Sequence, residues 1–150
     1  MICDSHDLAV RPGVGFTPSP SGAPVATRSN FQSETLIAMT AAVARYINAL
    51  QDQGGLKGTD IANFTDVSSA TVHRWKAGTH VPHPATQLML AQLHYIVSRL
   101  DDYYTPEEVR LWLYAPHPQL EGRPAIDSIV GGQAADVIAI LDRLDAEVYL

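Results

Sequence analysis

Hydroxyl and basic side chains recur at helical spacing over residues 68–76, SSATVHRWK, and they suit hydrogen bonding to the edges of DNA bases. Val72 and Trp75 fall on one face of a helix through this segment, so the residues between them point away from that face. Serine, histidine and arginine donors match the major groove, where arginine forks onto guanine. The candidate DNA-contacting residues are Ser68, Ser69, Ala70, His73, Arg74 and Lys76.

These candidates differ in the contact that each side chain suits. Ser68 is a natural N-cap, and a helix N-terminus also binds phosphate. Ser69 and Ala70 are placed to meet base edges, the alanine through a thymine methyl group, and His73 suits a base or a phosphate. Lys76 suits the phosphate backbone, which positions a protein without specifying a sequence. The alternative interpretation is a helical hairpin that serves only as scaffold.

A shorter helical pattern precedes this segment, and the two together predict a helix-turn-helix over residues 59–82. Ile61 and Ala62 give the first helix an apolar face, and Val67 fills the three-residue turn. Asp66 stands at the turn position that usually holds glycine, and aspartate tolerates a left-handed backbone better than most residues. With Lys57 included, the local charge over residues 57–82 is only +1, so specific DNA binding is expected to need a dimer that doubles the contacts.

Helical periodicity continues on both sides of this unit, and no segment shows the sustained alternation of a strand. We therefore expect an all-α fold of about six or seven helices, a helix-turn-helix bundle followed by a small helical domain. A long helix is expected from Ser33 to the Gly54-Gly55 pair. Its apolar face comprises Leu36, Met39 or Thr40, Val43, Ile47 and Leu50.

Start and stop signals mark the remaining helices. One helix follows Pro84, and Thr105 opens the next one through a capping box with Glu108. Pro116 ends that helix, and a loop leads to a short helix after Pro124. The last helix runs through residues 133–150 after two glycines. Residues 1–32, rich in proline, glycine and serine, are expected to form a flexible arm.

The charge is unevenly distributed along the 150 residues. The net charge is −6, but residues 1–100 carry +1 and residues 101–150 carry −7. Because phosphate contacts supply most nonspecific DNA affinity, the acidic part is expected to face something other than DNA. Sign asymmetry of this kind indicates a second partner.

The segment VRLWLYAPHPQLEGRPAIDSIVGGQAADVIAILDRL, residues 109–144, resembles the C-terminal domain of the Xre/MbcA/ParS antitoxins. The shared features are a Trp-led helix, a proline-containing loop of the form Leu-x-Gly-x-x-Pro, a small-residue turn and a Val- and Leu-rich final helix. In this chain they are Trp112, Pro116, Pro118, Leu120, Gly122, Pro124, Gly131, Gly132, Val137 and Leu141. Together with the helix-turn-helix, the resemblance covers roughly residues 35–150.

The resemblance implies a fold, a partner and a site. Members of that family form dimers and hold a RES-domain toxin that degrades NAD, blocking its pocket with residues near the antitoxin C-terminus. Composition sets off residues 1–32 as the arm, and the resemblance implies a 33–104 Xre-like helix-turn-helix domain and a 105–150 toxin-binding domain. The candidate toxin-binding residues, on the exposed side of the last helix and at its end, are Asp142, Arg143, Asp145, Glu147, Tyr149 and Leu150.

Other chemistry has little support in the sequence. Cys3 with His6, and His80 with His83, lack a second ligand pair at metal-site spacing, so no metal site is expected. No phosphate loop or nucleophile–base pair is present, and we expect neither enzymatic activity nor a cofactor. No apolar run is long enough to span a membrane, and we expect a cytoplasmic protein.

The leading hypothesis is an antitoxin of a type II toxin–antitoxin system. Such a protein neutralises a RES-domain toxin by direct binding and represses its own operon through the helix-turn-helix at operator DNA. One alternative is a stand-alone DNA-binding transcriptional regulator without a toxin partner. A further alternative is a protein-interaction module whose helix-turn-helix no longer binds DNA.

Overall fold

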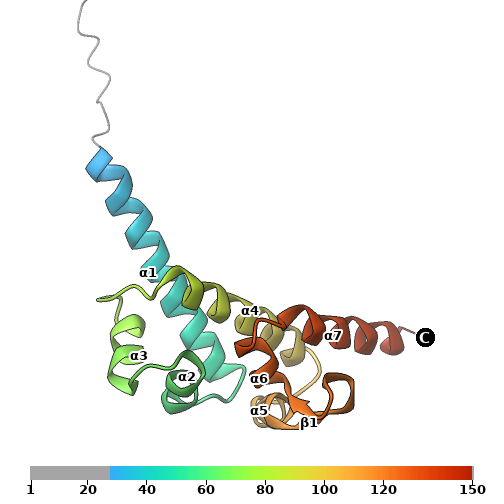
Figure 1. Ribbon diagram of the computed structural model, residues 1–150. Coiled ribbons are helices and arrows are strands. Elements are labelled where there is room, and N and C mark those ends of the chain that lie inside the picture. The colour runs from blue at the N-terminus through green and yellow to red at the C-terminus, as the bar shows by residue number, and fades with distance from the viewer. Residues whose placement is uncertain (1–27, 150) are drawn as a thin grey trace, which may run out of the picture.

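A computed structural model of the chain describes residues 28–149 as an all-α fold, which confirms the predicted fold class (Figure 1). Most of the expected arm and the last residue, Leu150, lie outside the described residues. The helices are α1 (Arg28–Asp52), α2 (Gly58–Thr65), α3 (Ser69–Lys76), α4 (Pro84–Asp101), α5 (Pro106–Tyr114), α6 (Ala125–Val130) and α7 (Ala134–Val148).

The segment between α5 and α6 is more ordered than the loop expected from the sequence. Strands β1 (Pro116–His117) and β2 (Arg123–Pro124) pair antiparallel around a 3₁₀ turn, η1 (Pro118–Leu120). Leu120 is buried, and the ring of His117 packs at a tilt of 49° against Trp112, with ring centroids 4.4 Å apart. The left-handed backbone at Glu121 and Gly122 closes the turn.

Helix α4 lies at the centre of the hydrophobic core. Its side chains Leu90, Leu93, Ile96, Val97 and Leu100 are buried. The helix packs against α1 on one side and against α5, α6 and α7 on the other, so one core extends through the whole described body. Because α4 supplies core to both parts, the division at residue 104 stays a prediction.

Helix α1 differs from its predicted form at its N-terminal end. It begins at Arg28 rather than Ser33, and its first turns extend beyond the body (Figure 1). Val43, Ile47 and Leu50 are buried as predicted, but the side chain of Leu36 is 52% exposed. The prediction for Leu36 is wrong because α4 starts only at Pro84 and does not reach far enough to cover this end of the helix.

Helices α2 and α3 are joined by a turn that has the geometry predicted for residues 59–82. Asp66 adopts the left-handed conformation at φ 55° and ψ 47°, and the N–H of Val67 donates to the carbonyl of Ala62 at 3.0 Å. Ala62 and Trp75 are buried between α2, α3 and the rest of the core. The aspartate therefore takes the place of the glycine that usually makes this turn.

The turn from α1 to α2 lies directly against the start of α5, and one glycine makes this approach possible. Gly55 has φ +60°, and a Cβ atom there would lie 2.6 Å from the carbonyl oxygen of Pro106. Gly132 has a similar φ of +80°, but a Cβ atom there would meet nothing within 4 Å. The two glycines thus share a left-handed backbone conformation, but only Gly55 is crowded by a neighbouring segment.

We expect Gly55→Ala to destabilise the fold more than Gly132→Ala. The left-handed conformation costs alanine about 1 kcal/mol at either position. The clash with Pro106 adds about 1–3 kcal/mol at Gly55 alone. Urea denaturation of both variants measures the difference, and equal losses would contradict this packing of α5.

Candidate functional site

The solvent-facing side of α3 carries the side chains that the sequence proposed for DNA contact. Ser69, Ala70, His73 and Arg74 are exposed, and the buried Trp75 anchors the opposite side of the helix. The predicted orientation is therefore present. Contact with bases by these residues stays a prediction.

Two of the six candidates also hold the helix in place. The hydroxyl of Ser68 accepts the N–H of Thr71 at 3.2 Å, which confirms the predicted N-cap. The ammonium of Lys76 donates to the side-chain oxygen of Gln51 on α1 at 2.7 Å. The position of α3 is thereby tied to α1.

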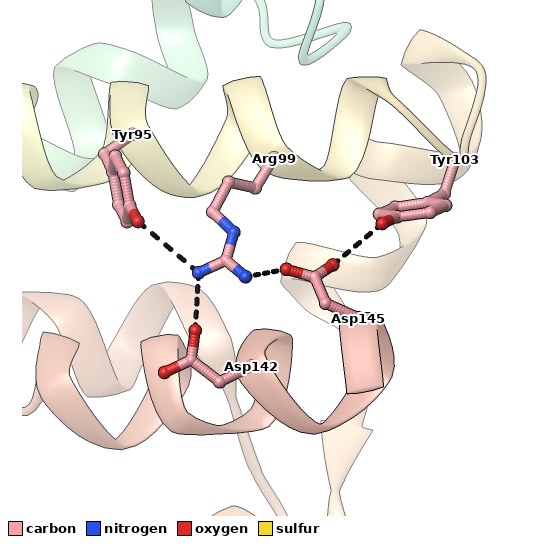
Figure 2. Close-up of polar contacts among 5 residues, drawn as sticks. All are labelled: Tyr95, Arg99, Tyr103, Asp142 and Asp145. Carbon is pink, nitrogen blue, oxygen red and sulfur yellow. Dashed lines mark hydrogen bonds and ion pairs between the residues drawn. The ribbon is translucent and has the colours of Figure 1, made fainter. Parts of the chain in front are cut away.

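A charged cluster joins α7 to α4, and it contains two of the candidate toxin-binding residues (Figure 2). The guanidinium of Arg99 donates to Asp142 at 2.7 Å and to Asp145. The hydroxyl of Tyr103 donates to the other oxygen of Asp145 at 2.9 Å, and Arg99 also approaches the hydroxyl of Tyr95 at 3.4 Å. The five side chains fasten the second half of α7 to α4.

This cluster corrects the expected exposure of Asp145. The sequence analysis placed Asp142 and Asp145 on the exposed side of the last helix, whereas the structure turns both carboxylates toward Arg99. The side chain of Asp145 is only 31% exposed. Their spacing of three residues puts both on the side of α7 that faces α4.

The remaining candidates on α7 do face solvent. Arg143 and Glu147 are exposed, and Tyr149 is 87% exposed. Leu150 lies outside the described residues. The exposed part of the predicted site is thus the outer side of α7 and its end.

An apolar groove adjoins that end of α7, and the sequence analysis did not identify it. Two hollows share Tyr104: one lies between α7 and the end of α4, the other along α5. We call this surface the Tyr104 groove. It is lined by Tyr103, Tyr104, Glu108, Leu111, Trp112, Ala115, Leu144, Glu147 and Val148.

Exposed hydrophobic side chains and carboxylates meet in the Tyr104 groove. Leu111 is 68% exposed and Val148 is 64% exposed, and Glu108 and Glu147 lie beside them. The sequence did contain one indication of this groove. Leu111 lies on a different face of α5 from the buried Val109 and Leu113, so its apolar side chain is directed away from the core. Tyr103 and Val148 become neighbours only when α7 packs on α4.

An ion pair links the two candidate surfaces through their supporting helices. Arg110 on α5 donates through Nε and Nη2 to Asp60 on α2, at 3.2–3.3 Å. Asp60 also accepts the N–H of Lys57 at 2.8 Å and so caps α2. Partial burial alone would raise the pKa of Asp60, but the hydrogen bonds from Lys57 and Arg110 and the charge of Arg110 lower it overall.

We expect Asp60→Asn to remove part of the acid dependence of stability. Because the folded-state pKa of Asp60 lies below its ordinary value of 3.8, its carboxylate stabilises the fold at neutral pH. That stabilisation is lost as the pH falls through the folded pKa. The variant should therefore be less stable at pH 7, with a gap to the wild type that narrows from about pH 5 to about pH 2.

Denaturation free energies across this pH range test the prediction. Asp52→Asn is the control. Asp52 is an exposed carboxylate at the C-terminal end of α1, where the helix dipole does not stabilise a negative charge. A gap for Asp60→Asn that stays constant with pH would contradict the ion pair.

Residues 28–149 contain neither a metal-binding cluster nor a membrane-spanning helix. Among residues 28–149 no three histidine, cysteine or acidic side chains gather as a metal site would require. His83 accepts the N–H of Ala85 and caps α4, whereas Cys3 and His6 lie outside the described residues. Within residues 28–149, no helix combines the length and apolar character needed to cross a bilayer.

Comparisons with known proteins identify three relatives, although no protein-family model matches the chain. The mycobacterial cidal antitoxin MbcA of Mycobacterium tuberculosis and Mycobacterium bovis is 25% identical over 108 residues, covering 72% of this chain and 96% of that protein. A probable mycobacterial cidal antitoxin of M. tuberculosis is 32% identical over 83 residues, which are 55% of this chain and 70% of that protein.

A solved structure shares the fold. A chain in the crystal structure of the M. tuberculosis MbcT–MbcA toxin–antitoxin complex superposes with a TM-score of 0.62 at 25% identity. The match covers 71% of this chain and 96% of that one. The shared fold therefore takes in most of the described body.

Proposed function

This chain belongs to the family of mycobacterial cidal antitoxins, and on that premise we propose that it is the antitoxin of a type II toxin–antitoxin system. It acts in the cytoplasm, neutralises a RES-domain, NAD-degrading toxin by direct binding, and represses its own operon through residues 33–104. One observation carries this function. Helix α3 lies at one end of the helical body, and α5 and the end of α7 lie at the other (Figure 1). The first end exposes the α3 side chains, and the second holds the Tyr104 groove.

Residues 105–150, together with the end of α4, supply the toxin-binding surface. The Tyr104 groove offers exposed apolar area in a chain segment of strongly negative charge. Such a surface fits a toxin segment that carries apolar side chains flanked by cations. Arg143, Glu147 and Tyr149 contact the toxin around the groove, and Leu150 extends this contact.

Asp142 and Asp145 have a different part in this proposal. Their carboxylates are bonded to Arg99, so they hold α7 against α4 and position its exposed side chains. Asp142, with 63% of its side chain exposed, also keeps an edge available to the toxin. The assignment of toxin contact is thus strongest for the outer side of α7.

We expect Val148→Glu to weaken the toxin complex by about 10–100-fold, because it places a charge in the apolar part of the interface. Val130→Glu is the matched control: Val130 is 49% exposed at the end of α6, outside the Tyr104 groove. Calorimetric titration against the toxin encoded beside this gene measures both affinities. Growth rescue on co-expression should fail for Val148→Glu alone. Equal affinity of the two variants would contradict the assigned surface.

The exposed side of α3 supplies the DNA-binding surface. His73 and Arg74 have the donors for base edges, and Ser69 and Ala70 have the small side chains that allow close approach. Ser68 and Lys76 position the helix and lie beside the phosphate backbone. Because few cations lie near α3, the proposed DNA-binding species is a homodimer, which doubles the contacts with DNA.

We expect Arg74→Ala to weaken binding to the DNA upstream of the gene by about 10–100-fold, the loss typical of one bidentate guanine contact. Arg143→Ala removes the same charge from the opposite end of the molecule and should leave DNA affinity unchanged. Gel-shift titrations at several salt concentrations compare the two. If Arg74→Ala bound DNA with unchanged affinity, α3 would not be the helix that contacts the bases. DNA binding by a chain that fails to bind the neighbouring toxin would favour the stand-alone regulator.

A further inference from the structure

Trp112 lines the Tyr104 groove, and its backbone carbonyl lies in the last turn of α5. A carbonyl inside a helix accepts the N–H of the residue four positions later. For Trp112 that residue is Pro116, which has no N–H. The N–H of Ala115 bonds to Leu111, so regular helical bonding stops one residue before Trp112. The sequence therefore leaves the Trp112 carbonyl without its usual backbone donor.

The side chain of His117 supplies the missing donor. Its Nε2 atom lies 2.8 Å from the carbonyl oxygen of Trp112. Because a carbonyl oxygen only accepts hydrogen bonds, Nε2 carries the proton in this contact. The same imidazole ring packs against the indole ring at a tilt of 49°, with centroids 4.4 Å apart. A single side chain thus contacts both the backbone and the ring of Trp112.

The β1–η1–β2 hairpin holds His117 in place. His117 pairs with Arg123 across the two strands, and its carbonyl accepts the N–H of Gly122 at 2.9 Å. Leu120 anchors the turn in the hydrophobic core. The guanidinium of Arg123 donates to the side-chain oxygen of Gln133, the residue before α7, at 2.7 Å. His117 is therefore carried by a backbone that is fastened to the core and to the start of α7.

The wall of the groove along α5 depends on the position of Trp112. This hollow is lined by Tyr104, Glu108, Leu111, Trp112 and Ala115. Tryptophan is enriched among the residues that dominate binding energy at protein interfaces. A ring that is already fixed loses less conformational freedom when a partner binds. His117 is not among the lining residues of either hollow, so its effect on the groove passes through Trp112.

We propose that His117 is a positioning residue of the toxin-binding surface. Its N–H caps the end of α5 and fixes the Trp112 ring as a wall of the Tyr104 groove before the toxin binds. This inference rests on the proposed function, because it requires that the toxin contacts the groove. It extends the determinants of toxin affinity from α7 to the hairpin that follows α5.

Four variants separate the hydrogen bond from the ring packing. His117→Gln keeps an N–H donor and loses the ring, His117→Phe keeps a ring and loses the donor, and His117→Ala loses both. Gln119→Ala is the matched control, because Gln119 is exposed in the same hairpin and lines neither hollow.

Calorimetric titration against the toxin encoded beside this gene compares these variants. His117→Ala and His117→Phe should bind about 5–20-fold more weakly than the wild type, because the carbonyl loses its donor. His117→Gln should stay within about 3-fold of the wild type, and Gln119→Ala should be unchanged. Wild-type affinity of His117→Phe would overturn the role of the hydrogen bond.

A double-mutant cycle shows whether His117 acts through Trp112. In a Trp112→Ala background, His117→Ala should weaken toxin binding by less than about 2-fold, because the ring that it positions is absent. Urea denaturation of every variant confirms that the chains are folded. An equally large effect of His117→Ala in both backgrounds would overturn the proposal, since His117 would then act through the fold as a whole.

Fluorescence of Trp112 tests the positioning without toxin. Trp75 is the other of the two tryptophans, so a Trp75→Phe background isolates the signal of Trp112. Acrylamide should quench Trp112 more strongly after His117→Ala, but not after His117→Gln or Gln119→Ala. Equal quenching with and without His117 would overturn the proposal. If quenching changes as expected but the wild type binds no toxin, the proposed function fails and the contact of His117 with Trp112 holds.

Discussion

The rest of the structure depends on the burial of α4. Five of its side chains, from Leu90 to Leu100, have no exposed surface, and they contact helices from both halves of the chain. Each buried residue of this size contributes about 1.5–3 kcal/mol by leaving water, which is more than a surface ion pair supplies. The relative positions of α1, α5, α6 and α7 follow from their packing on this one helix.

Polar contacts then set the finer positions on that core. The Arg110–Asp60 pair connects α5 to the capped start of α2, and Arg99 holds two carboxylates of α7 against α4. Partly exposed pairs of this kind add little to stability, but they select one arrangement of helices among several that bury similar apolar area. The surfaces proposed for DNA and toxin are thereby carried on one helical body with a shared core.

The proposed surfaces differ in the physical basis of recognition. The α3 face has hydrogen-bond donors and few apolar groups, as a groove of DNA requires. The Tyr104 groove combines exposed aromatic rings with carboxylates. Because the two surfaces lie on different helices, the proposed operator and toxin contacts do not compete for the same residues.

The sequence alone determined the all-α class and the local features of the helices, because each depends on residues within a few positions of one another. These features are the capped helix starts at Ser68 and Thr105, the left-handed turn at Asp66 and the outward orientation of Arg74. Only the tertiary structure decided that Leu36 stays exposed and that Asp145 turns inward. It also decided that Tyr103 and Val148 line one groove. Those outcomes depend on where α4 begins and on how α7 lies across it. Helical periodicity indicates which face of a helix is apolar, but not how much of that face a distant helix covers.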